Sequence, residues 1–322
     1  LFNNFHVYQI IDFTLLKNHL FKSSKGVSVS KKKKPTSVET CAIFYSKNKV
    51  EDYDILHIIS RLEKNTKDGL FFEFDYYDFY SITKNDAISN KYIWRCNLLG
   101  GNRLNHLVIK LNDTNKNLIT LNNYITQNLN IHKDRFSEGF IRGTPKGEEN
   151  NENVFCEYIV NKQILTATNF DKNKFEKFSR SQKFYRISNE IAFLAPLIVI
   201  KEQITNSKLL IRKLYKDTAY DSRIVGISLN TKLDAENLYN KLKTNERINA
   251  LKTSATGSQF FLGSSSVIQK ADVENWVIPL DSDEITLSNY EQIILNDVLD
   301  YIYPSWYEGA NAKINKNDAT LE

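Results

Sequence analysis

The sequence is poor in residues that mark several common kinds of protein. Its 322 residues include no methionine, three cysteines, five prolines and eleven glycines. Cys41, Cys96 and Cys156 are odd in number and far apart, which argues against a disulfide framework and favours a reducing, cytoplasmic location. The sequence has no run of about 18 consecutive apolar residues, so it predicts no membrane span.

Motifs for catalysis and metal binding are also missing. The five histidines are scattered, none at metal-ligand spacing from a cysteine, so we predict no zinc site. The sequence lacks Gly-x-Gly, Pro-Pro, Glu-x-Lys, Gly-x-Ser-x-Gly and the Gly-x-x-x-x-Gly-Lys-Ser/Thr phosphate loop. Cys41 lies in an apolar stretch, which indicates a small core residue and not a nucleophile. The carboxylates Glu73, Asp75 and Asp78 could suggest a metal site, but we favour a solvated strand face.

Charge is distributed unevenly along the chain. The net charge is +5, although residues 276–322 contain nine acidic and two basic residues. The basic remainder can attract nucleic acid through its phosphates, and we expect the acidic end to lie away from DNA. Many proteins of this net charge bind no DNA, so charge alone does not decide. The run Lys31–Lys34 lies on a predicted loop, for which a DNA-facing role and disorder are equally good interpretations.

The first 132 residues predict an incomplete α/β unit followed by a mixed connector. β-branched and aromatic residues predict strands over 7–13 and 38–46, separated by a short helix over 14–21 and a loop. We expect a helix over 51–64, a partly extended stretch over 70–82, and mostly helix over 102–129. Two strands cannot make a whole domain, and the chain begins inside a structured segment. We therefore interpret it as a fragment of a longer protein.

The remainder predicts an α+β unit with a mixed sheet. Turn-forming residues fill 138–153, and 253–266 is a small, polar, glycine-containing loop. Helices are expected over 233–251 and 285–303, with a polar tail over 304–322. Short strands are expected over 155–160, 183–187, 196–200, 208–215 and 223–229, with a strand-like end to 271–280.

The order of several segments resembles adenine-N6 DNA methyltransferases of restriction-modification systems of type I and type IIG. IIDF (10–13), LF (20–21) and ETCAIFYSKN (39–48) resemble the last strands of the catalytic domain. YIWRCNLLGGNRL (92–104) resembles a tryptophan-bearing segment that joins the catalytic domain to the target-recognition domain.

The second half of the chain resembles the target-recognition domain itself. EGFIRG (138–143) is similar to its first segment, and FLAPLIVIKEQI (193–204) with AYDSRIVGISL (219–229) to its central strands. SATGSQFFLGSSSVIQKADVENWVIPL (254–280) is similar to its closing segment, which also occurs in type I specificity subunits. The resemblance covers nearly the whole chain to about residue 303, and its strength lies in the order of loose motifs.

The resemblance implies a carboxy-terminal portion without the methylation chemistry. It implies the edge of a methyltransferase sheet over 1–50, a connector over 51–132 and a DNA-binding domain over 133–303. The family binds S-adenosylmethionine with a glycine-rich turn and holds the flipped adenine with an Asn/Asp-Pro-Pro-Tyr/Phe motif, and both are missing. We therefore carry over no catalytic or cofactor-binding residue, and expect S-adenosylmethionine to bind elsewhere in the full-length protein. The implied partners are double-stranded DNA and restriction or specificity subunits.

Candidate DNA contacts are polar and basic residues on turns of the second half. Lys and Arg neutralise phosphates, whereas Arg, Asn and Gln read base edges. Tyr185 and Tyr220 lie near basic residues and could stack on DNA, but core packing is the better interpretation. Each candidate taken alone is more often a solvated surface residue. The candidates are Arg142, Lys146, Arg180, Gln182, Lys183, Arg212, Lys213, Arg223, Ser254, Thr256, Ser258 and Gln259.

Two other classes of function stay open. The chain could be an interaction module that docks a subunit of a restriction complex through the helices 233–251 and 285–303, although neither shows a sustained heptad. It could also be an enzyme with an unrecognised site, which a pocket of clustered carboxylates or histidines would favour.

Overall fold

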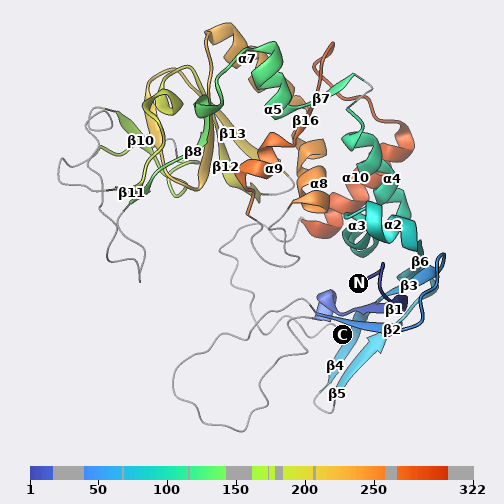
Figure 1. Cartoon of the computed structure of the whole chain (residues 1–322). Helices are drawn as coiled ribbons and strands as arrows, with labels where there is room; N and C mark the ends of the chain where they lie inside the picture. Colours follow the sequence, from blue (N-terminus) through green and yellow to red (C-terminus); the bar gives the residue numbers. More distant parts are fainter. Residues whose placement is uncertain are drawn as a thin grey trace, which may run out of the picture. The chain divides into compact units, whose positions relative to one another are not determined.

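The chain folds into two compact units, Leu1–Asn105 (unit 1) and His106–Glu322 (unit 2) (Figure 1). The computed structural model describes residues 1–16, 40–66, 69–114, 117–142, 162–172, 174–177, 184–205, 208–257 and 267–303. The boundaries predicted near residues 50 and 132 fall inside these units. Within the described ranges, no helix is long and apolar enough to cross a membrane.

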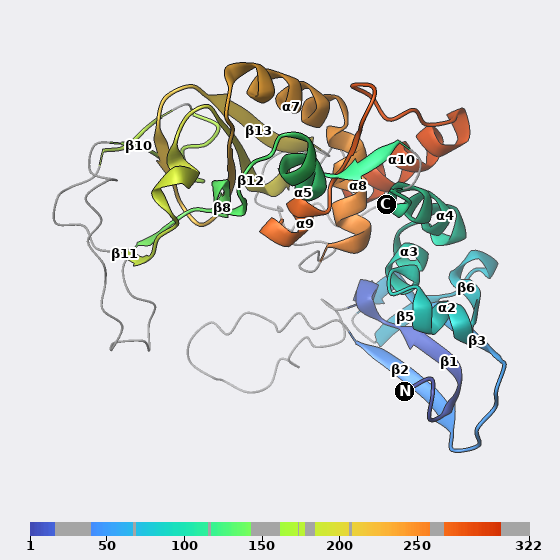
Figure 2. The ribbon, with the colours of Figure 1, turned by 45° about the horizontal axis from the view of Figure 1, so that its top comes forward.

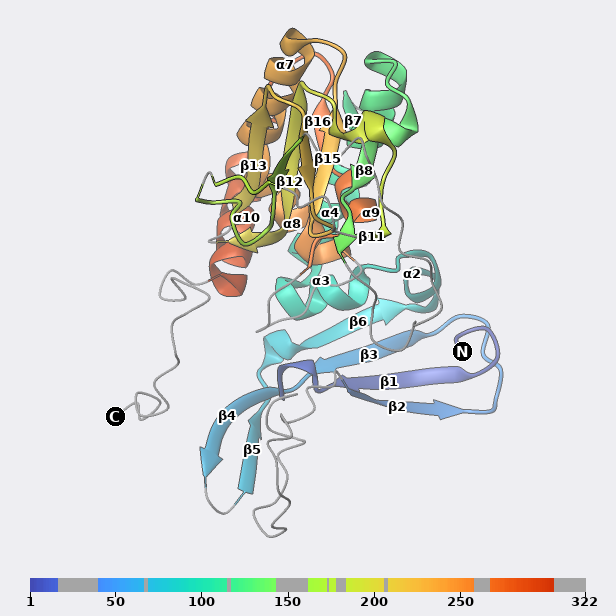
Figure 3. The same ribbon diagram turned by 90° about the vertical axis from the view of Figure 1, so that its left-hand side faces the viewer.

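Unit 1 is built on a four-stranded mixed sheet in the order β2-β1-β3-β6. The central strands β1 (His6–Asp12) and β3 (Asp54–Ile59) are parallel, and β2 (Cys41–Ser46) and β6 (Phe79–Thr83) pair antiparallel to them. The helices α2 (Lys84–Ser89) and α3 (Ile93–Leu99) lie on one face of this sheet (Figure 3). The core between them contains Val7, Ile10, Ile55, Ile82, Ala87 and Ile93.

The predicted helix over 51–64 is wrong, because this stretch forms β3 and then β4 (Arg61–Thr66). The apolar spacing of Ile55, Ile58 and Ile59 fits either structure, but β-branched residues favour a strand and β1 supplies a parallel partner. Strand β4 forms a hairpin with β5 (Gly69–Glu73). The described part of the unit also contains the 3₁₀ turns η1 (Thr14–Leu16) and η2 (Tyr76–Asp78). The predicted helix over 14–21 is described only as far as η1.

Unit 2 is organised around an antiparallel sheet in the order β13-β12-β15-β8. Its strands are β8 (Phe136–Glu138), β12 (Leu197–Thr205), β13 (Lys208–Leu214) and β15 (Ile224–Ser228). All three strand pairs are antiparallel, so this sheet is not the mixed sheet that the sequence predicts for this part of the chain. A parallel pair occurs instead in the small ladder of β10 (Gln163–Leu165) and β14 (Thr218–Tyr220).

A second small ladder lies next to these strands along the chain. It pairs β9 (Ile141–Arg142) with β11 (Phe184–Arg186), and the 3₁₀ turns η4 (Lys133–Arg135) and η5 (Glu190–Phe193) precede β8 and β12. Tyr220 is fully buried, donates its hydroxyl to the carbonyl of Ala192 at 3.0 Å, and packs edge-on against Phe193 at 5.0 Å. Tyr220 is therefore a core residue, as expected.

After its sheet strands, unit 2 continues with the helices α7 (Lys232–Thr244), α8 (Glu246–Thr256), α9 (Lys270–Glu274) and α10 (Asn289–Ile302) (Figure 2). The helix predicted over 233–251 is divided at Asn245 and continues to Thr256, so the loop expected from 253 begins later. The helix expected from 285 begins at Asn289, because Ser288 and Glu291 form a reciprocal capping box.

The helix predicted over 102–129 is only partly correct. Helix α4 (Gly101–Asn112) contains the boundary between the two units, and it is followed by the short strand β7 (Leu118–Thr120). Asn117 adopts a left-handed conformation with φ of 59°, which a helix interior does not allow. β7 then pairs with β16 (Val277–Pro279), and helix resumes as α5 (Leu121–Asn123) and the π-helical turn η3 (Tyr124–Asn128).

Candidate nucleic-acid interface

Charged side chains from four separate segments gather at one end of the antiparallel sheet of unit 2. We call this group, Glu138, Arg186, Glu202, Asp221 and Arg223, the charged end. The carboxylates of Glu138 and Asp221 and the guanidinium groups of Arg186 and Arg223 all act electrostatically on Glu202. Arg186 pairs with Glu138, with Nη2 and Oε2 2.7 Å apart. The arrangement combines arginines, which bind phosphates and guanines, with carboxylates that orient them.

Close backbone packing brings these segments together. Gly139 lies against Tyr220, and a Cβ added to Gly139 would be 1.9 Å from the Tyr220 carbonyl oxygen. The amide of Phe140 donates to that oxygen at 3.0 Å, and the amide of Ser222 donates to the carbonyl of Phe140 at 2.8 Å. The glycine therefore lets the chain pass from β8 to β9 directly over the segment that carries Asp221 and Arg223.

Within the charged end, the carboxyl group of Glu202 is the one that burial and neighbouring charges perturb most clearly. Burial of its carboxyl group, together with the nearby carboxylates of Glu138 and Asp221, raises its pKa to about 8. The arginines Arg186 and Arg223 act in the opposite direction. Among the described residues, the Glu202 carboxylate has no hydrogen-bond or ion-pair partner. Near neutral pH the group can therefore gain or lose a proton when its surroundings change.

Two more basic residues adjoin the charged end and are held by acidic partners. Arg142 pairs with Glu176 at 2.9 Å and lies over the ring of Phe140, 5.5 Å from its centroid. Lys201, beside Glu202 on β12, pairs with Asp171 at 2.9 Å. These contacts fix the cations in place but leave them near the surface, with side chains 35% and 15% exposed. A phosphate would have to compete with each carboxylate.

The structure brings together some of the predicted DNA contacts and separates others. Arg142 and Arg223 lie at or beside the charged end. Arg212 and Lys213 pair with Val199 and Ile198, near the start of β12. Arg212 donates to the carbonyl of Phe170 at 2.7 Å, and Lys213 is ion-paired with Glu236. Lys146, Arg180, Gln182, Lys183, Ser258 and Gln259 lie outside the described residues, as does Lys31–Lys34.

The remaining two candidates belong to helix α8 and not to a loop. Ser254 is fully buried and donates its hydroxyl to the carbonyl of Ala250 at 2.9 Å. Thr256 donates to the carbonyl of Lys252 at 2.8 Å. A fully buried hydroxyl cannot reach DNA, so we remove Ser254 from the candidate interface. The sequence suggested a loop because Ser and Thr favour turns, but here both hydroxyls satisfy helical carbonyls.

Sequence reasoning missed Arg186, Lys201 and Glu202. A signal for two of them is present, since the strand run LIVI (197–200) is apolar and is followed at once by Lys201 and Glu202. Charged residues at that point indicate that the strand leaves the core. Arg186 had no such signal, because its partner Glu138 is distant in the sequence.

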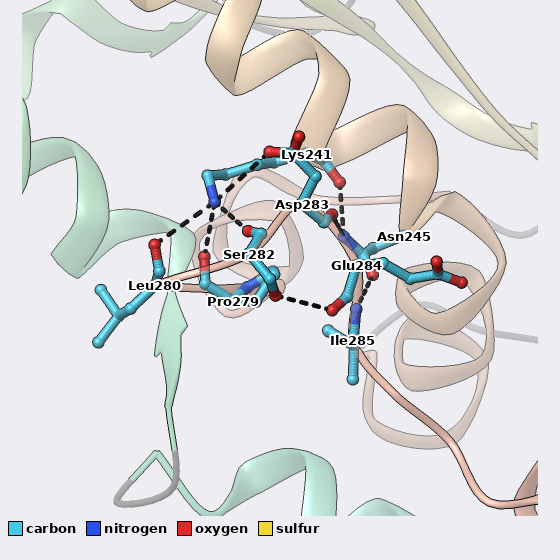
Figure 4. A network of polar contacts seen from close by, with 8 residues as sticks. All are labelled: Lys241, Asn245, Pro279, Leu280, Ser282, Asp283, Glu284 and Ile285. Carbon is cyan, nitrogen blue, oxygen red and sulfur yellow. Dashed lines mark hydrogen bonds and ion pairs between the residues drawn. The ribbon is translucent and has the colours of Figure 1, made fainter.

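The closing segment of unit 2 is held by side chains of α7 and α8 (Figure 4). The buried ammonium group of Lys241 donates to the carbonyls of Pro279 at 3.0 Å, Leu280 at 3.5 Å and Ser282. Asn245 donates to the carbonyl of Asp283 and accepts from the amide of Ile285, both at 2.8 Å. These contacts replace missing strand partners and serve the fold, so we assign the network no role in binding.

A buried histidine of unit 1 is held by two polar neighbours. His57 is 1% exposed, and its ring nitrogens lie 3.7 Å from Asp12 Oδ2 and 3.3 Å from Asn97 Nδ2. The expected core position of Cys41 is wrong, because Cys41 is exposed. Burial of the thiol, although partial, and Asp12 raise the pKa of Cys41, which disfavours a nucleophilic thiolate.

Two of the three carboxylates considered as a metal site, Asp75 and Asp78, bond to the backbone of the turn η2. Asp75 and Asp78 cap the turn η2 reciprocally, and Asp78 is buried. In the described part of the chain, no three His, Cys, Asp or Glu residues are grouped so that they could hold a metal ion.

Comparison with known proteins does not assign the chain. No protein-family model matches it, and no curated protein matches its sequence.

Proposed function

We propose that this chain binds double-stranded DNA sequence-specifically through unit 2. In this proposal it is the carboxy-terminal, target-recognising portion of an adenine-N6 DNA methyltransferase of a restriction-modification system. The portion contributes no methylation chemistry itself, and S-adenosylmethionine binds in the rest of the full-length protein. Restriction or specificity subunits are further partners in this proposal.

The observation that carries the proposal is the convergence of three segments distant in the sequence. The segments 138–143, 193–204 and 219–229 supply the last residue of β8, most of β12 and all of β15, and these strands lie side by side in one sheet. At the end of that sheet they place Glu138, Glu202 and Arg223, and β11 adds Arg186. A rigid sheet that presents arginines at one end, together with a carboxyl group that has no partner among the described residues, suits base reading better than a dispersed set of surface cations.

Unit 1 supports the proposal that the chain is a portion of a larger protein, because one face of its sheet exposes apolar side chains. Phe44 and Leu56 both pair with Gln9 across the sheet, so they share a face, and they are 41% and 38% exposed. Parallel strand pairs are normally covered on both faces. β2 also lies at an edge of the described sheet and carries no charged residue, although edge strands usually do. Such a sheet fits the edge of a larger α/β domain.

The proposal is tested by removing single positive charges and measuring duplex affinity. We expect Arg223→Gln and Arg186→Gln each to weaken binding of a mixed-sequence duplex several-fold at low salt. Lys232→Gln is the matched control, because Lys232 is also exposed but begins α7 and lies over Tyr215. Equal affinities for all four proteins would show that the charged end does not face DNA.

An interaction module is the second candidate, and it too has a specific observation in its favour. Tyr290, Ile293 and Tyr301 lie on one face of α10 and are 61%, 53% and 45% exposed. A subunit could dock on that face. If the chain fails to bind duplex at low salt but forms a stable complex with a restriction subunit that Ile293→Glu abolishes, this function replaces DNA reading.

A further inference from the structure

We propose that Glu202 is a base-reading residue, whose side-chain carboxyl oxygen accepts a hydrogen bond from an exocyclic amino group of a base in the major groove. This inference rests on the DNA-binding function proposed above and deepens it. In the major groove, such amino groups are cytosine N4 and adenine N6. Acidic residues are the acceptors that suit cytosine N4, whereas phosphates repel them.

The backbone holds Glu202 from both sides. Its amide donates to the carbonyl of Arg223 at 3.0 Å, and its own carbonyl accepts from the amide of Ile268 at 3.2 Å. The next residue, Gln203, forms a β-bridge with Val267. A side chain that reads a base must be held within a fraction of an ångström, and a residue fixed to two neighbouring segments meets that need better than a loop residue.

The carboxylates around Glu202 are occupied, but its own carboxylate is not. Glu138 binds Arg186 at 2.7 Å, and Asp221 accepts from the amides of Ala167 at 2.9 Å and Arg223 at 3.1 Å. In the described chain, Glu202 makes no comparable bond. A half-buried acceptor without a donor is costly, so a ligand that supplies an N–H group gains more there than at the exposed surface.

The two arginines distinguish base reading from simple repulsion of DNA. Arg186 and Arg223 both lie close enough to Glu202 to counteract the raised pKa of its carboxyl group. Their side chains can neutralise phosphates on either side of a groove, so Glu202 can approach a base edge between them. A lone carboxylate without flanking cations would only repel the backbone.

The test is selection of duplexes from a random pool by the wild-type chain, Glu202→Ala and Glu202→Gln. Glu190→Ala is the control, because Glu190 is an exposed carboxylate of the same unit, paired with Lys162 at 3.2 Å. We expect the wild type to enrich a motif with one position that favours cytosine or adenine. Glu202→Ala should lose that preference, by roughly tenfold to a hundredfold, whereas Glu202→Gln should shift it towards adenine, with which a glutamine amide pairs; both should keep the other positions. The control should enrich the wild-type motif.

The outcomes separate this inference from the function on which it rests. If the Glu202 variants keep the whole motif, or bind all duplexes more tightly by the same factor, Glu202 faces phosphates and the inference is wrong, although DNA reading stands. If the wild type binds no duplex at low salt, the proposed function fails first. The favoured base at the lost position identifies the amino group as that of cytosine or of adenine.

Discussion

Two lysines on the consecutive helices α7 and α8 are buried, but their ammonium groups are satisfied very differently. Lys241 donates to three carbonyl oxygens and lies 3.8 Å from the carboxylate of Asp283. Lys252 is 3% exposed, and among the described residues it has only the carbonyl of Leu111, at 3.5 Å. Burial without hydrogen-bond partners disfavours the charged, protonated form of a lysine. Burial accordingly lowers the pKa of Lys252 to about 8.

Lys252 therefore predicts a pH-dependent stability. Between its folded pKa of about 8 and its usual value of 10.5, the unfolded chain binds more protons, so the free energy of unfolding rises with pH in this window. Lys252→Met should remove this rise and stabilise the chain at pH 7 by up to about 3 kcal/mol. Urea unfolding of both proteins at pH 7 and pH 10 measures the effect. If the free energy of unfolding changes between pH 7 and pH 10 by the same amount in both proteins, this prediction is wrong.

Gly226 carries a prediction about packing at the same scale. A Cβ at this position would lie 2.2 Å from Cζ and Oη of Tyr220, which is fully buried. We expect Gly226→Ala to lower the free energy of unfolding by roughly 1–3 kcal/mol, because the core around the ring cannot move freely. Combining it with Tyr220→Leu should cost less than the sum of the two single changes. Strict additivity in denaturant unfolding would show that the ring is not the obstacle.

At the scale of elements, the closing segment depends on helices α7 and α8 more than on its own strand pairing. β16 is three residues long and, among the described strands, pairs only with β7, whereas Lys241 and Asn245 hold the next residues through carbonyls and amides. Asn249 adds bonds to both the carbonyl and the amide of Val277, at 3.0 and 2.8 Å. Side chains of α7, of α8 and of Asn245 between them thus take the place of a neighbouring strand.

Lys241→Met should release this segment without unfolding the sheet. The three carbonyls would lose their donor, and a buried acceptor left without one costs about 1–3 kcal/mol. We expect faster amide hydrogen exchange at residues 280–285 and little change in β12 and β15. Lys243→Met is the control, since Lys243 lies on the same helix but pairs with Glu246 nearer the surface. If amide hydrogen exchange at residues 280–285 is equally fast in both variants, Lys241 does not hold this segment.

Predictability from the sequence also differed between elements, for physical reasons. The β-branched runs over 7–13, 196–200 and 223–229 were confirmed as β1, β12 and β15. The stretch 51–64 was misread because its apolar spacing suits both a helix and a strand, and only pairing with β1 decides. The break at Asn245 and the pairing of 118–120 with 277–279 depend on tertiary hydrogen bonds.

The candidate site was predicted only in part for the same reason. Arg142 and Arg223 could be chosen because the sequence predicts turns at or beside them, although Arg142 ends the short strand β9. Glu202 could not, because its importance depends on Glu138, Asp221 and the two arginines that the fold brings near it. The burial of Ser254 was hidden by its membership of a polar stretch that continues as helix α8.

At the scale of the whole molecule, the uncovered edge of unit 1 has a consequence for association. β2 is an uncharged strand at the edge of the described sheet, with Ile43, Phe44 and Tyr45 40–51% exposed. Edges of this kind pair with other strands. We expect the chain to self-associate at micromolar concentration and Phe44→Lys to shift it towards the monomer. Sedimentation velocity measures both, and Tyr76→Lys, at an 87% exposed aromatic outside β2, is the control.

The central claim is that unit 2 reads duplex DNA, and a salt titration tests it most directly. The affinity of the chain for a mixed pool of duplexes should fall steeply and linearly in a log–log plot as salt rises, by about 0.9 for each phosphate contacted. Arg223→Gln should reduce the slope by about 1 if that side chain contacts a phosphate. At moderate salt, the surviving complexes should be enriched in a short common motif. Absence of binding at low salt, or binding that salt does not weaken, would contradict the account.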